Sequence, residues 1–353
     1  MNNYRKKIWI GRLAPLIQAS GLSHLFRAFY GGTGHILTFH RVIPPLASPR
    51  IHNHQGLEVS PEHLEEVIQY FVKRDYQFFS LDQLQAALAR GNADQKFVVF
   101  TFDDGYQDVW QYAYPIFQQY KVPFAIYIST NFPDRTAILW WYMLEDFVLR
   151  KDHISFCLSG KTYEIFCSNR EEKEAAFASL RQIILNEPDQ LRLPGILKTI
   201  FGDLYSTLMQ DSQSLSLSWE QIRSLNQDPL VTIGAHTVNH YPLSQLDESM
   251  LQEEVEGSRL RIEEEIQTPV RHFAYPFGKK GEASLREFEF VQQAGFLTAT
   301  TTRIGNIFPA HKDFPTALPR ISINEVSRSP VLTLQTTGLI PFVVNRGRRV
   351  ITD

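Results

Sequence analysis

The sequence KFVVFTFDDG, residues 96–105, joins an apolar run directly to two adjacent carboxylates and a glycine. The six residues before the acids are apolar or β-branched, which is typical of a strand buried on both faces in a parallel sheet. Asp103 and Asp104 would then lie at the carboxyl end of this strand, where barrels and open sheets of this class bind ligands. A simple turn is the alternative, because Asp and Gly both favour tight reversals.

A second predicted strand ends in two histidines. VTIGAHTVNH, residues 231–240, is a short apolar run that leads to His236 and His240. On a helix or tight turn this spacing brings their Cβ atoms to roughly 5–6 Å, which suits one metal ion. A His pair on an ordinary surface turn is the alternative. Asp104 also follows a strand, however, so a barrel or wound sheet would bring all three to one rim, as a metal site with an open position for water.

Strands and helices alternate along most of the chain. ILTFHRV, residues 36–42, is typical of a strand that closes with His40. RHFAYPFG, residues 271–278, indicates a strand followed by a turn, which could form a pocket wall or a plain loop. Helical patterns between the strands predict an α/β fold, either a parallel barrel or a wound sheet.

In this order, the segments resemble the NodB-type polysaccharide deacetylases, carbohydrate esterase family four, over roughly residues 35–325. The resemblance implies a distorted (β/α) barrel and a divalent metal held by Asp104, His236 and His240. Zn²⁺ is the metal expected first, with Co²⁺, Ni²⁺ or Mn²⁺ as alternatives. The activity implied is removal of N-acetyl groups from N-acetylhexosamine units of a bacterial surface polysaccharide or its precursor.

The resemblance also implies roles in catalysis and substrate binding. Asp103 would act as the catalytic base, and the backbone amide of Phe277 would help to hold the oxyanion. Tyr275, in the same motif as Phe277, and Trp141 are expected to contact the carbohydrate substrate.

Two positions depart from the family pattern, and the first concerns the base. The third motif commonly has an arginine that orients the base, and here that position is Ala274. Arg320, at another apparent strand end, is the first candidate to replace it, with Arg271 and Arg41 behind it. A surface salt bridge is the alternative role for Arg320.

The second departure concerns the general acid. The last motif of the family usually supplies a histidine near the carboxyl end, but residues 318–353 contain none. His40 resembles the amino-terminal histidine of the exopolysaccharide-linked, circularly permuted branch of the family, and it is therefore the expected acid. A packed histidine at a strand–loop junction is the alternative.

The expected layout has three parts: an amino-terminal helical segment (1–34), the barrel (35–325) and a solvated or loosely docked carboxyl-terminal tail (326–353). Residues from about 134 to 218 interrupt the alternation with aromatic and charged stretches, and we expect a helical and aromatic insertion there on the catalytic rim. The aromatic residues 140–142 could stack on sugar rings or serve packing.

Composition narrows the classes of function. The chain has 353 residues and a net charge of −3, so it lacks the basic surface on which nucleic-acid binding normally rests. Cys157 and Cys167 could pair across a hairpin, but two cysteines make no disulfide framework. No signal peptide or membrane span is recognised, which favours a cytoplasmic location. Membrane-surface contact by residues 13–30 is an alternative to packing on the domain, and the oligomeric state is open.

Two other functions stay open at this point. Ala274 and the missing carboxyl-terminal histidine would suit a barrel that binds glycan without turnover. A metal-dependent hydrolase of another amide or of an O-acetyl ester would use the same site residues.

Overall fold

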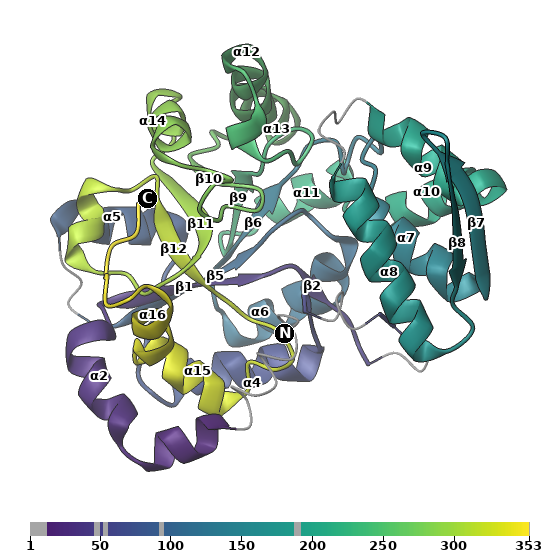
Figure 1. Cartoon of the computed structure of the whole chain (residues 1–353). Helices are drawn as coiled ribbons and strands as arrows, with labels where there is room; N and C mark the ends of the chain where they lie inside the picture. The colour runs from purple at the N-terminus through teal and green to yellow at the C-terminus, as the bar shows by residue number, and fades with distance from the viewer. Residues whose placement is uncertain (1–12, 46–49, 52–55, 92–94, 187–191, 353) are drawn as a thin grey trace. The chain divides into compact units, whose positions relative to one another are not determined.

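Seven parallel strands close into a barrel in the computed structural model, which describes residues 13–45, 50–51, 56–91, 95–186 and 192–352 (Figure 1). Around the barrel the order is β1 (Gly34–Phe39), β12 (Leu318–Ser322), β11 (Thr298–Ile304), β10 (His272–Ala274), β9 (Val231–Ala235), β6 (Phe124–Ile128) and β5 (Phe97–Phe102). β5 pairs back with β1, and the short strand β4 (Gln77–Phe78) pairs with the first residues of β5. The predicted (β/α) barrel is therefore confirmed.

The neighbouring strands β1 and β5 bring the polar residues at their carboxyl ends side by side. Every residue of β1 and β5 is buried, and the register pairs Phe39 with Phe102. The backbone N–H of Asp103 donates to the carbonyl of Phe39 at 3.0 Å, so the ladder continues one residue beyond β5. His40 and Asp103 therefore follow neighbouring strands at their carboxyl ends, the rim that carries the active site in barrels of this kind.

Helices cover the outside of the barrel, because strands buried on both faces need an outer layer. None of the helices in the described part of the chain is long and apolar enough to cross a membrane. The compact unit that contains the barrel is called the barrel unit below. Besides the barrel strands, it contains β2 (Arg41–Val42), β3 (Glu58–Val59), α2 (Leu22–Tyr30), α4 (Pro61–Val72), α5 (Leu81–Arg90), η1 (Val109–Ala113), α6 (Tyr114–Tyr120), α11 (Trp219–Asn226), η4 (Leu243–Gln245), α12 (Glu248–Gln252), η5 (Glu253–Gly257), α13 (Ser258–Ile266), α14 (Leu285–Gln293), η6 (Pro309–Asp313), α15 (Ser329–Thr336) and α16 (Leu339–Val344).

The two terminal segments pack on each other. Residues 13–19 and α2 are helical, whereas residues 1–12 of the expected amino-terminal segment lie outside the described residues. In the carboxyl-terminal segment, α15 buries residues 331–336, and the ring centroid of Phe342 in α16 lies 4.7 Å from that of Tyr30 in α2. The expectation of a loosely docked tail is wrong, because the apolar residues of α15 and α16 find partners on the barrel unit.

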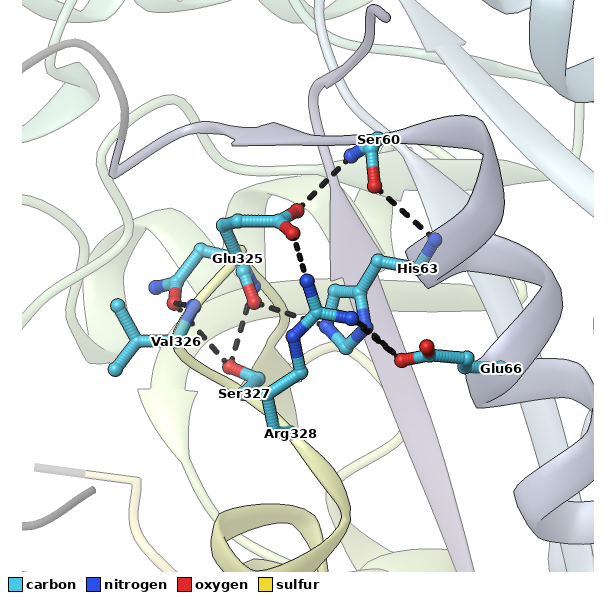
Figure 2. Close-up of polar contacts among 8 residues, drawn as sticks. Ser60, His63, Glu66, Glu325, Val326, Ser327 and Arg328 are labelled. Atoms are coloured by element: carbon cyan, nitrogen blue, oxygen red, sulfur yellow. Dashed lines mark hydrogen bonds and ion pairs between the residues drawn. The ribbon is translucent and has the colours of Figure 1, made fainter. Parts of the chain in front are cut away.

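A polar network ties the loop after β12 to the start of α4 (Figure 2). The Arg328 guanidinium donates to Glu66 at 2.5 Å and also to Glu325, and it lies 3.1 Å from Nδ1 of the buried His63. Glu325 in turn accepts from the backbone N–H of Ser60 at 3.0 Å. These contacts hold together the two segments that follow β12 and β3, beside the seam where β12 and β1 close the barrel.

Residues 46–56 and 135–216 form a second compact unit. It contains α7 (Trp140–Arg150), the hairpin β7 (His153–Leu158) and β8 (Lys161–Phe166), α8 (Arg170–Leu185), α9 (Leu193–Phe201), η3 (Gly202–Leu204) and α10 (Tyr205–Gln213). The unit has its own apolar core, which includes Phe147, Phe177 and Ile200. Both cysteines lie on or next to the hairpin as free thiols, Cys157 exposed and Cys167 buried.

Candidate active site

Three side chains from two strand ends face one another as a candidate metal centre. Asp104 follows β5, and His236 and His240 follow β9. Their ligand atoms all lie within 4.8 Å of one another, and the histidine Nε2 atoms lie 3.3 and 3.2 Å from Asp104 Oδ1. Burial would raise the pKa of Asp104, but the two imidazoles hold it well below its usual range.

The surroundings of one atom in this cluster indicate whether the three residues suit a metal. Asp104 Oδ1 is buried and has no hydrogen-bond partner among the described residues. A buried carboxylate oxygen normally has a partner, because leaving it unsatisfied is costly. A divalent cation between this oxygen and the two imidazole nitrogens would satisfy all three, so the donor set fits a metal of the zinc type.

A hydrogen bond sets the orientation of His236. Its Nδ1 lies 2.7 Å from the carbonyl oxygen of Ala274, which can only accept. Nδ1 therefore carries a proton, and Nε2 is the ring nitrogen that faces Asp104. Metal-binding histidines are commonly fixed in this way by a second contact. Ala274 thus contributes its backbone to the site at the position where the family usually has an arginine.

The loop that carries His240 is held by a residue that the sequence did not reveal. Thr237 and His240 adopt left-handed backbone conformations with φ of 67° and 60°. The carboxylate of Glu254, in the π-helical turn η5, accepts from the backbone N–H groups of Val238 at 3.0 Å and Asn239 at 2.8 Å, and from the Asn239 side chain at 2.6 Å. Burial raises the pKa of Glu254. Glu254 lies in an acidic run that is typical of a solvated helix face, so no local sequence pattern indicates this role.

Asp103 lies beside the metal cluster and is clamped by an arginine. Arg320, 1% exposed, donates to the two carboxylate oxygens at 2.6 and 2.7 Å, and its Nε donates to the carbonyl of Thr301 at 2.9 Å. Burial would raise the pKa of Asp103, but the Arg320 charge lowers it below its ordinary value. Asp103 is therefore ionised at neutral pH in a fixed orientation.

The other two arginines considered for this contact pair elsewhere. Arg41 donates to Asp108 at 2.6 Å, and Arg271 lies 3.8 Å from Asp82 on the surface. Of the three candidates, Arg320 is the one that the structure places on Asp103.

His40 lies close enough to the site to feel its charges. Burial lowers the pKa of His40, whereas the carboxylates of Asp104 and Asp103 act to raise it. The imidazole follows β1, directly beside the strand end that carries both acids. The structure therefore brings His40 together with Asp103 and the candidate metal ligands.

The three aromatic residues expected at the substrate differ in placement. Phe277 is 38% exposed with φ of 61°, and its ring centroid lies 5.1 Å from that of His240. Tyr275 is fully buried and donates its hydroxyl to the carbonyl of Thr316 at 2.8 Å, so its side chain supports the site from the core. Trp141 is half-buried at the start of α7 in the second unit, with its ring centroid 5.7 Å from that of Trp140.

Comparison with known structures shows the same fold in several deacetylases. The chain is 17% identical to the deacetylase PplD of Streptococcus pyogenes, with 86% of this chain and 97% of that chain covered and a TM-score of 0.55. It is 18% identical to IcaB of Ammonifex degensii, with 87% and 98% covered and a TM-score of 0.52. A de-N-acetylase from Aggregatibacter actinomycetemcomitans is 14% identical, with 86% and 99% covered and a TM-score of 0.52.

Sequence comparison defines the family. Curated protein sequences give no significant match to the chain. The family model for polysaccharide deacetylase matches residues 90–296, more than half of the chain, in agreement with the resemblance found in the motifs. The chain belongs to the polysaccharide deacetylase family and is a carbohydrate deacetylase.

Proposed function

We propose that the protein is a metal-dependent N-deacetylase that acts on N-acetylhexosamine units of a bacterial surface polysaccharide or its precursor. The observation that carries this proposal is the pair of adjacent strand-end carboxylates in different surroundings. Asp104 faces two imidazoles and has an unsatisfied oxygen, while Asp103 is ionised against Arg320. A metal-dependent amide hydrolase uses a Lewis acid and a base at one point, and this rim offers groups for both.

Asp104, His236 and His240 would hold the metal, for which Zn²⁺ is our first choice. When bound there, such an ion polarises a carbonyl group and lowers the pKa of water towards about 7. The hydrogen bond from His236 to Ala274 and the contacts of Glu254 keep the ligands in place for this purpose.

Asp103 would act as the general base. Its oxygens are held by Arg320, so one carboxylate oxygen can receive a proton from the attacking water without a change of side-chain orientation. The backbone N–H of Phe277 would donate to the oxyanion, a contribution of about 3–4 kcal/mol for one well-placed donor. The left-handed conformation of Phe277 sets the direction of this turn beside His240.

His40 would act as the general acid. The leaving sugar amine must take up a proton as the C–N bond breaks, and an imidazole is suited to deliver one near neutral pH. Its place directly after β1, beside the end of β5 that carries both carboxylates, supports this role.

The contact between Arg320 and Asp103 also bears on the alternative of a non-catalytic barrel. That alternative drew on Ala274, whose position usually carries the arginine that orients the base. Because Arg320 supplies a guanidinium to Asp103 from β12, the departure at Ala274 no longer argues against catalysis.

Metal analysis combined with acetate release tests the proposal. Protein purified with its metal should release acetate from N-acetylated chito-oligosaccharides, and treatment with a chelator should stop the release until metal is restored. Release of acetate from O-acetylated sugars alone would assign the site to an esterase instead. A metal-loaded protein that releases acetate from neither class of substrate would contradict the proposal.

A further inference from the structure

Exposed apolar side chains gather on the terminal helices. Fifteen large apolar side chains among the described residues are exposed, and six of these belong to helix 13–19, α2 and α16. Their exposed fractions range from 48% to 69%. The six are Leu13, Leu16, Leu25, Phe29, Val343 and Val344. Exposed apolar residues scattered singly need no explanation, but a concentration of this kind on neighbouring helices marks an interaction surface.

These helices are anchored to the barrel unit through their other faces. In α2, the rings of Phe26 and Tyr30 pack on Phe342 of α16, with centroid distances of 5.0 and 4.7 Å. A Cβ at Gly338, where φ is 86°, would come within 2.1 Å of the Tyr30 carbonyl oxygen, so the end of α2 and the start of α16 are in close contact. Figure 1 shows α2, α15 and α16 together on one side of the barrel.

On α2 the exposed apolar residues form a face of their own. Leu25 and Phe29 are four residues apart and are 68% and 62% exposed. Residues at this spacing lie one above the other on a helix. The helix therefore has one apolar face packed on α16 and a second, adjacent apolar face towards solvent.

The terminal segments that carry this surface have few acidic residues. The first acidic residue of the chain is Glu58, and residues 326–353 contain one, the terminal Asp353. Arg346 and Arg349 are exposed directly after α16. The whole chain nevertheless has a net charge of −3, so its acidic residues are concentrated away from the terminal segments.

We propose that helix 13–19, α2 and α16 dock the protein on an anionic lipid bilayer. An amphipathic helix with Leu and Phe on one face enters the boundary between headgroups and acyl chains, and basic residues beside it attract anionic headgroups. The excess of basic over acidic residues in both terminal segments favours a negatively charged lipid surface over a second copy of this chain, which would bring two cationic surfaces together. The docking is independent of the deacetylase activity proposed above.

Co-sedimentation with vesicles tests the docking. The full-length protein should bind vesicles of phosphatidylcholine containing phosphatidylglycerol, bind pure phosphatidylcholine more weakly, and lose affinity as the salt concentration rises. Leu25→Ser combined with Phe29→Ser should weaken binding by at least about tenfold, because two large apolar side chains no longer leave water. Arg346→Gln should weaken binding to the anionic vesicles and leave binding to pure phosphatidylcholine unchanged.

A matched control is available elsewhere on the barrel unit. Leu260 and Leu285, in α13 and α14, are each 61% exposed, and the double variant Leu260→Ser and Leu285→Ser should bind vesicles like the unmodified protein. Both double variants should keep the same thermal unfolding midpoint and the same acetate release from soluble oligosaccharide. Equal binding by the two double variants, or no binding by the unmodified protein, would overturn the proposal. So would a dimer that the Leu25 and Phe29 variant converts to a monomer.

Discussion

Asp103 and Asp104 are neighbours in the chain, yet they belong to two regions of the rim that are built differently. In the Asp103 region, a buried arginine from β12 satisfies both carboxylate oxygens. In the Asp104 region, the carboxylate faces two imidazoles and one of its oxygens is left without a hydrogen bond. A positive φ of 76° at Asp104 turns the chain between the two regions.

This difference shows how one strand end can supply two chemical functions. The charge of Arg320 keeps Asp103 ionised, as a proton acceptor requires. Asp104 faces the two imidazoles instead. The supports also differ in kind, because Arg320 acts through charge, whereas the histidine loop is held by backbone contacts to Ala274 and Glu254. Each region can therefore be broken without the other.

The largest effect is expected from substitutions of the two carboxylates themselves. Asp104→Ala should remove bound metal and activity together. Asp103→Asn should retain the metal and lower kcat by about 10²–10⁴-fold, the range typical of losing a general base. Metal content by mass spectrometry and acetate release measure the two effects. Loss of metal from Asp103→Asn, or retained metal in Asp104→Ala, would show that the two regions are not separate.

Removal of Arg320 should lower both the stability and the activity of the protein. Arg320→Met leaves the buried Asp103 carboxylate without its counter-charge, which should lower the free energy of unfolding by about 3–5 kcal/mol. The double variant Arg320→Met and Asp103→Leu removes the buried charge as well, so it should regain much of this stability while staying inactive. Denaturant unfolding measures both variants. An Arg320→Met protein as stable as the unmodified one would contradict the pairing.

The site residues at the rim of the barrel could be predicted because each pair directly follows an apolar strand in the sequence. The buried pattern of β5 places Asp103 and Asp104 at its end, and the apolar run of β9 does the same for His236 and His240. Local patterns of this kind carry over into the fold, since buried parallel strands are continuous apolar runs.

The supporting residues were harder to predict because they depend on contacts between distant segments. The choice of Arg320 over Arg41 and Arg271 depends on β1, which pairs with both β5 and β12 and so brings the ends of those two strands to one rim. Tyr275 lies in the interior because the chain after β10 turns its ring onto the core, which no local pattern indicates. Glu254 depends on a π-helical turn that changes the face of its helix.

Glu254→Gln should weaken the support of the histidine loop in the Asp104 region and leave the Asp103 region unchanged. A glutamine keeps one acceptor oxygen but directs an N–H₂ group at donors that the carboxylate now accepts from. Metal affinity should fall by about 10–100-fold, as is typical for residues that support metal ligands. Competition with a chromophoric chelator measures it, and kcat at saturating metal should change little. The exposed Glu253 offers a control, since Glu253→Gln should leave metal affinity unchanged. Equal affinities for all three proteins would remove Glu254 from this role.

The smallest effect is expected at the other end of β1, where His35 gives a histidine reference outside the site. His35 is buried between Asn306 at 2.9 Å and Tyr76 at 3.2 Å, and burial lowers its pKa to about 3. Below about pH 6.5 the unfolded chain therefore binds this proton while the folded protein does not, so stability falls as the pH drops.

This contribution should reach about 2 kcal/mol between pH 7 and pH 5. His35→Gln should remove it, so the free energy of unfolding of the variant should decline less steeply with falling pH than that of the unmodified protein. Denaturant unfolding at several pH values measures the two slopes, while acetate release per bound metal should stay the same because His35 lies at the start of β1, at the opposite end of the strand from the site. Equal slopes would mean that His35 takes up its proton in the folded protein. The contrast between a structural histidine at one end of β1 and the proposed general acid at the other would then fail.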